Sequence, residues 1–148
     1  MAANTVGTQE ASASQNQFSI EGDMMFVRVY GTMQVEDVVR VRELSDVLLA
    51  RYGYILLLAD GRYTTGISHE ARKRQKENIE RRGSVDPSHT AIYGASTTMR
   101  LLSNLVQRGI ALLSGESYPV SFVKSENEAR SILDTQRALL KKATVPPQ

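Results

Sequence analysis

The sequence contains no cysteine and only two histidines among its 148 residues. The lack of cysteine excludes disulfide bonds, thiolate catalysis and metal sites with cysteine ligands. With two histidines, a protein zinc site would need carboxylate ligands close to them, and no short cluster of histidine, aspartate and glutamate offers one. We therefore expect neither a metal nor a cofactor.

Long apolar runs are also absent, and no stretch reaches the roughly 18 apolar residues of a membrane span. The first 17 residues lack the basic start and the apolar core of a secretory signal peptide, so a cytoplasmic location is expected. Residues 1–16 are rich in alanine, serine, asparagine and glutamine. Such a segment buries too little apolar surface to offset its ordering entropy, which predicts a disordered tail. One domain is expected over residues 17–140, followed by a frayed tail over 141–148.

The net charge of +2 is unevenly distributed along the chain. Residues 69–82 contain six basic and three acidic side chains, so the excess positive charge is concentrated in this one segment. Any electrostatic attraction of a partner is therefore expected to involve this segment.

Hydrophobic periodicity predicts alternating strands and helices. A hairpin of residues 18–20 and 24–30 comes first, and Gly31 is expected to break its second strand. Residues 35–52 have a helical period and are followed by Gly53, a typical C-cap. The continuous apolar run 54–59 is typical of a strand that is buried on both faces of a parallel sheet. The later elements are expected at 68–82 (helix), 89–95 (strand), 96–113 (helix), 118–123 (strand) and 125–140 (helix).

The order β-β-α-β-α-β-α-β-α predicts an α/β fold. We expect a mixed, mostly parallel sheet of about five strands with helices packed on it.

Two loops lie where ligands usually bind in such sheets, at the carboxyl ends of strands. The candidate residues are Asp60, Arg62, Thr64, Thr65 and Ser68 in the first loop and Ser96 and Thr97 in the second. Backbone N–H groups and hydroxyls there have the chemistry to hold an anion. Neither loop matches a P-loop or a GxGxxG pattern, so the residues themselves favour helix capping and chain turning.

The sequence has no recognisable catalytic group. His69 follows Ser68 directly, but neighbouring helix residues point about 100° apart and do not form a dyad. A GxSxG nucleophile elbow is absent. An enzyme would need an unrecognised grouping of Asp60, His69 and Ser96, so we expect a protein that is not an enzyme.

The helix predicted over 68–82 has a thin apolar stripe, and much of its surface is therefore expected to be exposed. Pairs such as Glu70–Arg74 and Lys73–Glu77 have the i,i+4 spacing that supports a solvated helix. Exposed basic residues there are candidates for a protein contact, namely Arg72, Lys73 and Lys76. Nucleic-acid binding is not expected, because the segment lacks interleaved aromatic residues.

The helix predicted over 96–113 has an apolar arc of about 180°, wider than packing on one sheet requires. Burial between other helices is one explanation. The alternative is that Leu101, Leu105 and Leu112 contact a second copy, a partner or a lipid, and a homodimer would use this face.

The hairpin, the turn at Gly31, the buried strand ending at Asp60 and the loop after it resemble a STAS domain, the fold of bacterial anti-sigma-factor antagonists. Proteins of this family carry an Asp-Ser-Ser-Gly-Leu-like motif in that loop, with a serine that a partner kinase phosphorylates. This sequence has Tyr63-Thr64-Thr65-Gly66-Ile67 there. The resemblance implies Thr64 or Thr65 as the phosphorylated hydroxyl, while Tyr63 replaces the acid.

The runs LLLADGRYTTGISHEARKRQ, AIYGAS and ALLSGESYPVSFVKSENEARSIL are similar to divergent STAS-like proteins, which occur in myxobacteria and are described alongside the CRAL-TRIO lipid-binding fold. The resemblance implies a cytoplasmic signalling or scaffolding domain with a protein partner at the 60–82 loop and helix. The alternative is a module that binds a nucleotide, phosphate compound or lipid between the 60–68 and 94–98 loops.

Overall fold

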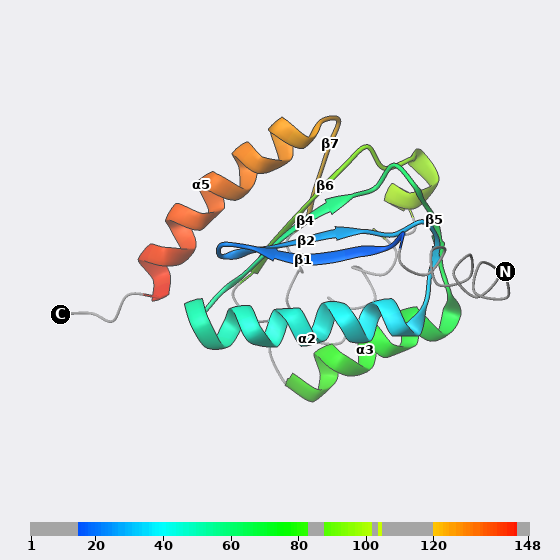
Figure 1. Cartoon of the computed structure of the whole chain (residues 1–148), viewed down its shortest axis with the longest axis horizontal. Helices are drawn as coiled ribbons and strands as arrows, with labels where there is room; N and C mark the ends of the chain where they lie inside the picture. The colour runs from blue at the N-terminus through cyan, green and yellow to red at the C-terminus, as the bar shows by residue number, and fades with distance from the viewer. Residues whose placement is uncertain (1–14, 83–87, 102–103, 105–119, 145–148) are drawn as a thin grey trace, which may run out of the picture.

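The computed structural model describes residues 15–82, 88–101, 104 and 120–144 (Figure 1). The strands are β1 (Gln17–Glu21), β2 (Met24–Arg28), β3 (Gly31–Met33), β4 (Ile55–Asp60), β5 (Thr64–Ile67), β6 (Ser88–Tyr93) and β7 (Val120–Val123). The helices are α2 (Val35–Tyr52), α3 (His69–Arg82) and α5 (Glu126–Thr144). A further helix begins at Thr97, after Ser96.

Five strands form the main sheet in the order β1-β2-β4-β6-β7. The β1–β2 hairpin is antiparallel, and every other neighbouring pair is parallel. The predicted mixed, mostly parallel sheet of about five strands is therefore confirmed. The buried strand expected at 54–59 is β4, the central strand of the five.

Different helices cover the two faces of the main sheet. α5 lies on one face over β4, β6 and β7, and α2 lies on the other over β1, β2 and β4 (Figure 1). α3 packs mainly against α2. This position explains the thin apolar stripe of α3, because only one side of the helix contacts the rest of the protein.

Alternating strand residues divide the core into two clusters, since successive side chains point to opposite faces of a sheet. Leu56 and Leu58 of β4 pack toward α5, where they meet Leu133. Ile55 packs toward α2, where it meets Leu48. Leu48, Leu56, Leu58 and Leu133 are fully buried.

Sequence signals at both ends of α2 match the limits of the helix in the structure. The expected span 35–52 is confirmed, and Gly53 takes the left-handed conformation (φ 78°) with its N–H donating to the Leu49 carbonyl at 2.9 Å. At the other end the Asp37 carboxylate accepts from the Gln34 N–H at 2.8 Å. Tyr52, the last residue of α2, is 38% exposed.

Several element boundaries differ from expectation, and two of the strands, β2 and β6, end two residues earlier than expected. Gly31 does not simply end a strand, because it begins β3, and β3 pairs in parallel with β5 as a separate two-stranded sheet. The predicted 60–68 loop thus contains a strand. α5 continues to Thr144, four residues past the predicted end of the domain at 140. Leu105 and Leu112 of the predicted apolar helix lie outside the described residues, whereas Leu101 is 61% exposed.

Candidate interaction site at the carboxyl edge of the sheet

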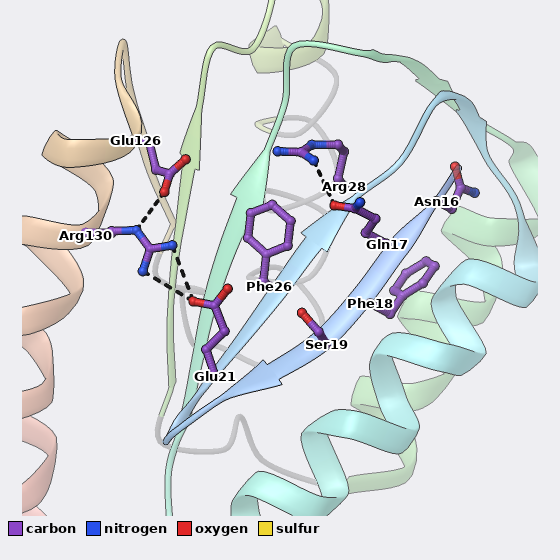
Figure 2. A pocket seen from close by; sticks show the side chains of 9 residues that line it. All are labelled: Asn16, Gln17, Phe18, Ser19, Glu21, Phe26, Arg28, Glu126 and Arg130. Carbon is purple, nitrogen blue, oxygen red and sulfur yellow. Dashed lines mark hydrogen bonds and ion pairs between the residues drawn. The ribbon is translucent and has the colours of Figure 1, made fainter. Parts of the chain in front are cut away.

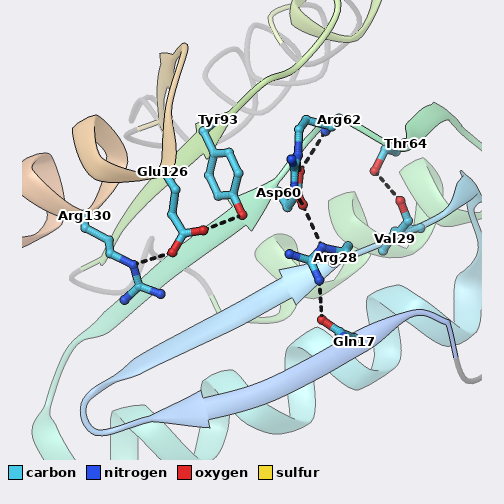
Figure 3. A network of polar contacts seen from close by, with 9 residues as sticks. All are labelled: Gln17, Arg28, Val29, Asp60, Arg62, Thr64, Tyr93, Glu126 and Arg130. Atoms are coloured by element: carbon cyan, nitrogen blue, oxygen red, sulfur yellow. Dashed lines mark hydrogen bonds and ion pairs between the residues drawn. The ribbon is translucent and has the colours of Figure 1, made fainter.

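Three functional side chains lie in one row across the carboxyl edge of the sheet. Arg28 ends β2, Asp60 ends β4 and Tyr93 ends β6, and the strand register places Asp60 between the other two. Because residues in register on neighbouring strands point to the same face, all three side chains lie on the face that α5 covers. The predicted residue Asp60 is the centre of this row (Figure 3).

Two arginines hold the Asp60 carboxylate, whose side chain is fully buried. The Arg28 Nε donates to Oδ2 at 2.7 Å, while the Arg62 Nε and Nη2 donate to Oδ1 at 3.0 Å and to Oδ2 at 2.8 Å. The Arg62 backbone N–H adds a further bond to Oδ1 at 3.0 Å. Burial alone would raise the pKa of Asp60, but the hydrogen bonds from Arg62 and Arg28 outweigh it and lower the pKa to about 2.

Arg28 connects this carboxylate to the β1 edge of the sheet. Its Nη1 donates to the Gln17 Oε1 at 2.7 Å, and its guanidinium lies over the Phe26 ring, 5.0 Å from the centroid. The Asp60 carboxylate, by accepting its hydrogen bond, raises the pKa of Arg28. Arg28 is therefore a fixed, paired cation in the centre of the site.

The chain segments that leave β2 and β4 are tied together beyond the sheet edge. Thr64 Oγ1 donates to the Val29 carbonyl at 2.9 Å, and the Gly31 N–H donates to the Tyr63 carbonyl at 3.0 Å. The predicted hydroxyl of Thr64 is therefore already engaged in a hydrogen bond to the segment that links β2 and β3. Thr65, the next residue of β5, is exposed.

Ser68 and the basic residues of α3 follow directly. The Ser68 Oγ accepts from the Ala71 N–H at 3.0 Å, which confirms Ser68 as the N-cap. Arg72, Lys73 and Lys76 are exposed, and within the described part of the chain no ion pair involves them.

The i,i+4 pairs expected along this helix differ from the pairing observed. Arg74 reaches Glu77 at 3.8 Å with i,i+3 spacing, in place of the expected Glu70–Arg74 and Lys73–Glu77 pairs. The three exposed cations are therefore available to a partner.

The two loops that the sequence singled out touch each other at Gly61. The Gly61 N–H donates to the Tyr93 carbonyl at 2.7 Å, and a Cβ at Gly61 would lie 2.9 Å from the Ala95 Cβ. Ser96 and Thr97 are exposed, and the Ser96 Oγ accepts from the Met99 N–H at 3.2 Å. Ser96 therefore caps a helix, as the residue pattern favoured.

A groove of about 610 Å³ opens on the sheet face beside α5, above β1 and β2 (Figure 2). Three of its ionic groups, Glu21, Glu126 and Arg130, are paired with one another, and Arg28 is paired with Asp60. Arg130 bonds Glu126 at 2.8 Å and Glu21 at 3.3 Å, and Glu126 also accepts from the Tyr93 hydroxyl at 3.2 Å. The sequence did not predict this groove, because its lining combines the hairpin of residues 16–28 with the start of α5, about a hundred residues later.

Within residues 15–82, 88–101, 104 and 120–144, no group of three metal-ligating side chains lies close enough to hold an ion. In the same part of the chain, no helix has the length and apolar character that crossing a membrane requires.

Two solved structures resemble this chain over 80% of its length. One is an uncharacterised protein of the DUF3478 family from Shewanella loihica, described as having a SpoIIAA-like fold, with 18% identity, 91% of its own chain covered and a TM-score of 0.54. The other is the anti-sigma-factor antagonist SpoIIAA in its unphosphorylated form, with 12% identity, 97% covered and a TM-score of 0.51. No family model matches the chain, and no curated protein matches it either.

The chain has a SpoIIAA-like fold. This confirms the STAS-like topology that the sequence suggested, while the suggested relation to CRAL-TRIO proteins gains no support from these matches. Arg28 is the main site residue that sequence reasoning missed. Arg28 follows Phe26 by two residues on the same face of β2, and in the sheet it lies beside Asp60.

Proposed function

We propose that this chain is a non-enzymatic protein-interaction domain of a signalling system, which binds a protein partner through residues 60–82. One observation carries the proposal: Arg72, Lys73 and Lys76 are exposed without an ion pair in the described structure, on a helix anchored by its Ser68 cap. Exposed cations on a rigid helix attract and orient an acidic partner.

The fold agrees with this proposal. One of the two matched structures is an anti-sigma-factor antagonist, a protein whose description names a role in regulation through another protein. The paired state of Asp60 agrees as well, because a carboxylate with a pKa of about 2 is a poor general base at neutral pH.

A charge-reversal experiment tests the proposal. The triple variant R72E/K73E/K76E and the unchanged protein are used as baits in the native cells, and the bound proteins are identified by mass spectrometry. We expect a partner that binds the unchanged bait and is lost from the variant. The control R51E/K124E/K142E alters three exposed cations elsewhere by the same net charge and should retain the partner. An identical set of bound proteins on all three baits would refute the proposal.

Phosphorylation of Thr65 would regulate this surface. Of the two candidate hydroxyls, Thr64 donates to Val29, whereas Thr65 is exposed on β5 between Asp60 and α3. A phosphate there adds about −1.5 to −2 charges beside the basic helix. Mass spectrometry of the protein from its native cells is expected to find phosphate on Thr65 and none on Thr64.

Small-ligand binding is the second candidate function. The groove beside Phe26 favours it, since about 610 Å³ is enough space for a small molecule. A thermal-shift screen with nucleotides, phosphate compounds and lipids separates the candidates, because a ligand at 100 times its Kd adds about 2.7 kcal/mol to stability. If no compound in the screen raises the melting temperature, small-ligand binding is contradicted and the protein-interaction proposal remains.

A further inference from the structure

Two exposed tyrosines stack on each other beyond the carboxyl edge of the sheet. Tyr30 follows β2 and Tyr63 follows β4, and their ring centroids are 4.7 Å apart with an interplanar angle of 22°. Tyr30 is 38% exposed and Tyr63 40% exposed. Large aromatic side chains that remain at the surface in contact with each other are typical of protein interfaces.

Arg62 extends this pair into a row of three. Its guanidinium lies 5.0 Å from the Tyr63 ring centroid, and it is held by the buried Asp60 carboxylate while half of the side chain stays exposed. Tyrosine and arginine are the residues most enriched among those that dominate binding energy at interfaces. We refer to Tyr30, Tyr63 and Arg62 as the aromatic platform.

Hydrogen bonds fix the backbone that carries the two tyrosines of the aromatic platform. The Tyr30 N–H donates to the Asn16 Oδ1 at 2.8 Å, and the Tyr63 carbonyl accepts from the Gly31 N–H at 3.0 Å. The Arg62 stem packs against Gly94, where a side chain would collide with it. Because the backbone is held, the two rings stack on each other and Arg62 is paired with Asp60, a partner that binds the platform loses less conformational entropy than it would on free side chains.

We propose that the aromatic platform anchors a protein partner whose contacting surface is acidic. This inference rests on the proposed function and identifies the centre of the binding surface and the chemistry of the partner. The four residues of β5 connect Tyr63 to Ser68, the cap of α3, over about 16 Å. An interface of ordinary size, about 800 Å² per partner, covers both the platform and the first turns of α3.

Charge decides the character of the partner. Arg62 is an exposed cation of the platform, Arg72 and Lys73 are exposed cations in the first turns of α3, and Glu70 is an exposed acid in the same turns. A complementary surface is therefore acidic around an apolar contact for the tyrosines. A single nucleic-acid strand fits less well, because Tyr30 already stacks on the Tyr63 ring and the Arg62 guanidinium lies over the same ring, so a base would have to displace one of them.

Peptide display on the full chain tests this anchor. Random peptides on phage are selected on the immobilised protein, and the enriched sequences are synthesised for affinity measurement. We expect them to be rich in aspartate and glutamate, and we expect their Kd to rise about tenfold or more in the variant Tyr30→Ser/Tyr63→Ser. The control Tyr52→Ser removes an equally exposed tyrosine (38%) near the opposite end of the strands and should leave the Kd within about twofold.

A second measurement uses the unchanged protein, so its result does not depend on whether the tyrosine variant folds. Tetranitromethane nitrates exposed tyrosines, and mass spectrometry locates the nitro groups. The bound peptide is expected to protect Tyr30 and Tyr63 while Tyr52 still reacts.

Several outcomes would overturn the anchor. They are a selection without binders, binders without acidic residues, equal affinity for the double tyrosine variant, or no protection from nitration. Tyrosine-dependent binding of a labelled single-stranded DNA, or tyrosine-dependent self-association in sedimentation, would also overturn it. A native partner lost on R72E/K73E/K76E but retained on Tyr30→Ser/Tyr63→Ser would leave the proposed function in place and remove only the anchor.

Discussion

The Arg28 guanidinium and the Asp60 carboxylate lie in register on neighbouring parallel strands and are joined by a hydrogen bond of 2.7 Å. Asp60 ends the central strand, and its side chain is fully buried, whereas 21% of the Arg28 side chain is exposed. Asp60 therefore connects the apolar core to the exposed edge, because the same carboxylate also fixes Arg62. The fixed positions of Arg28 and Arg62 at this edge of the sheet therefore depend on the buried Asp60 carboxylate.

Replacing Asp60 by asparagine tests that dependence. Asn keeps the size of the side chain but leaves Arg28 and Arg62 without their counter-ion, and breaking such a buried pair costs about 3–5 kcal/mol. We expect a loss of this order in the free energy of unfolding, measured by circular dichroism in urea. Arg62→Gln should cost less, because half of that side chain is in water. Equal losses in the two variants would contradict the central role of Asp60.

Acid should remove the contribution of Asp60. Its pKa is about 2 in the folded protein and 3.8 ordinarily, so its contribution to stability is complete above about pH 4 and is lost as the pH falls toward 2. The pKa difference corresponds to about 2 kcal/mol. The gap in stability between the unchanged protein and Asp60→Asn should therefore narrow by about this amount between pH 5 and pH 2. Other carboxylates with lowered pKa, such as Asp23, contribute equally to both proteins. A gap independent of pH would contradict this assignment.

Much of the fold could be predicted because its signals are local. The helical period of 35–52 with Gly53 after it, and the apolar run that became β4, each identify an element from a few adjacent residues. The β3–β5 sheet could not be predicted in this way. Its strands have only three and four residues, lack apolar alternation, and form through pairing of Gly31 with Thr64.

The site was predictable only in part for a related reason. Asp60 was identified by its place at the end of a central strand, where side chains of α/β proteins meet ligands. Its partner Arg28 is 32 residues away, and the contact requires knowing that β2 lies beside β4. The stacking of Tyr30 on Tyr63 depends on the same neighbourhood, so Tyr63 was interpreted only as a departure from a motif.

The two threonines of β5 should differ in their effect on stability. Thr64→Val keeps the shape and strand propensity of the residue but leaves the Val29 carbonyl without its donor, which costs about 1 kcal/mol. Thr65→Val changes an exposed position and should stay within about 0.5 kcal/mol. Thermal unfolding of the two variants measures the difference. A larger loss for Thr65→Val would contradict the structural role of Thr64.

Gly94 should be required for the position of Arg62. Its φ of 73° disfavours any other residue, and a Cβ there would clash with the Cγ of Arg62. Gly22 has a similar φ of 62° with nothing within 4 Å, so Gly22→Ala measures backbone strain alone, about 1 kcal/mol. We expect Gly94→Ala to cost about 1–2 kcal/mol more than this control, because Arg62 must move.

A double-mutant cycle identifies the origin of the extra cost. If Gly94→Ala displaces Arg62 from Asp60, then Asp60→Asn costs less in the Gly94→Ala background than in the unchanged protein, since one of its ion pairs is already broken. In the Gly22→Ala background Asp60→Asn should keep its full cost, because Gly22 lies in the hairpin turn, away from Asp60. If the free-energy costs of Gly94→Ala and Asp60→Asn simply add in the double variant, then Gly94 is required only for the backbone conformation of the turn. Arg62 would then keep its bond to Asp60 after the substitution.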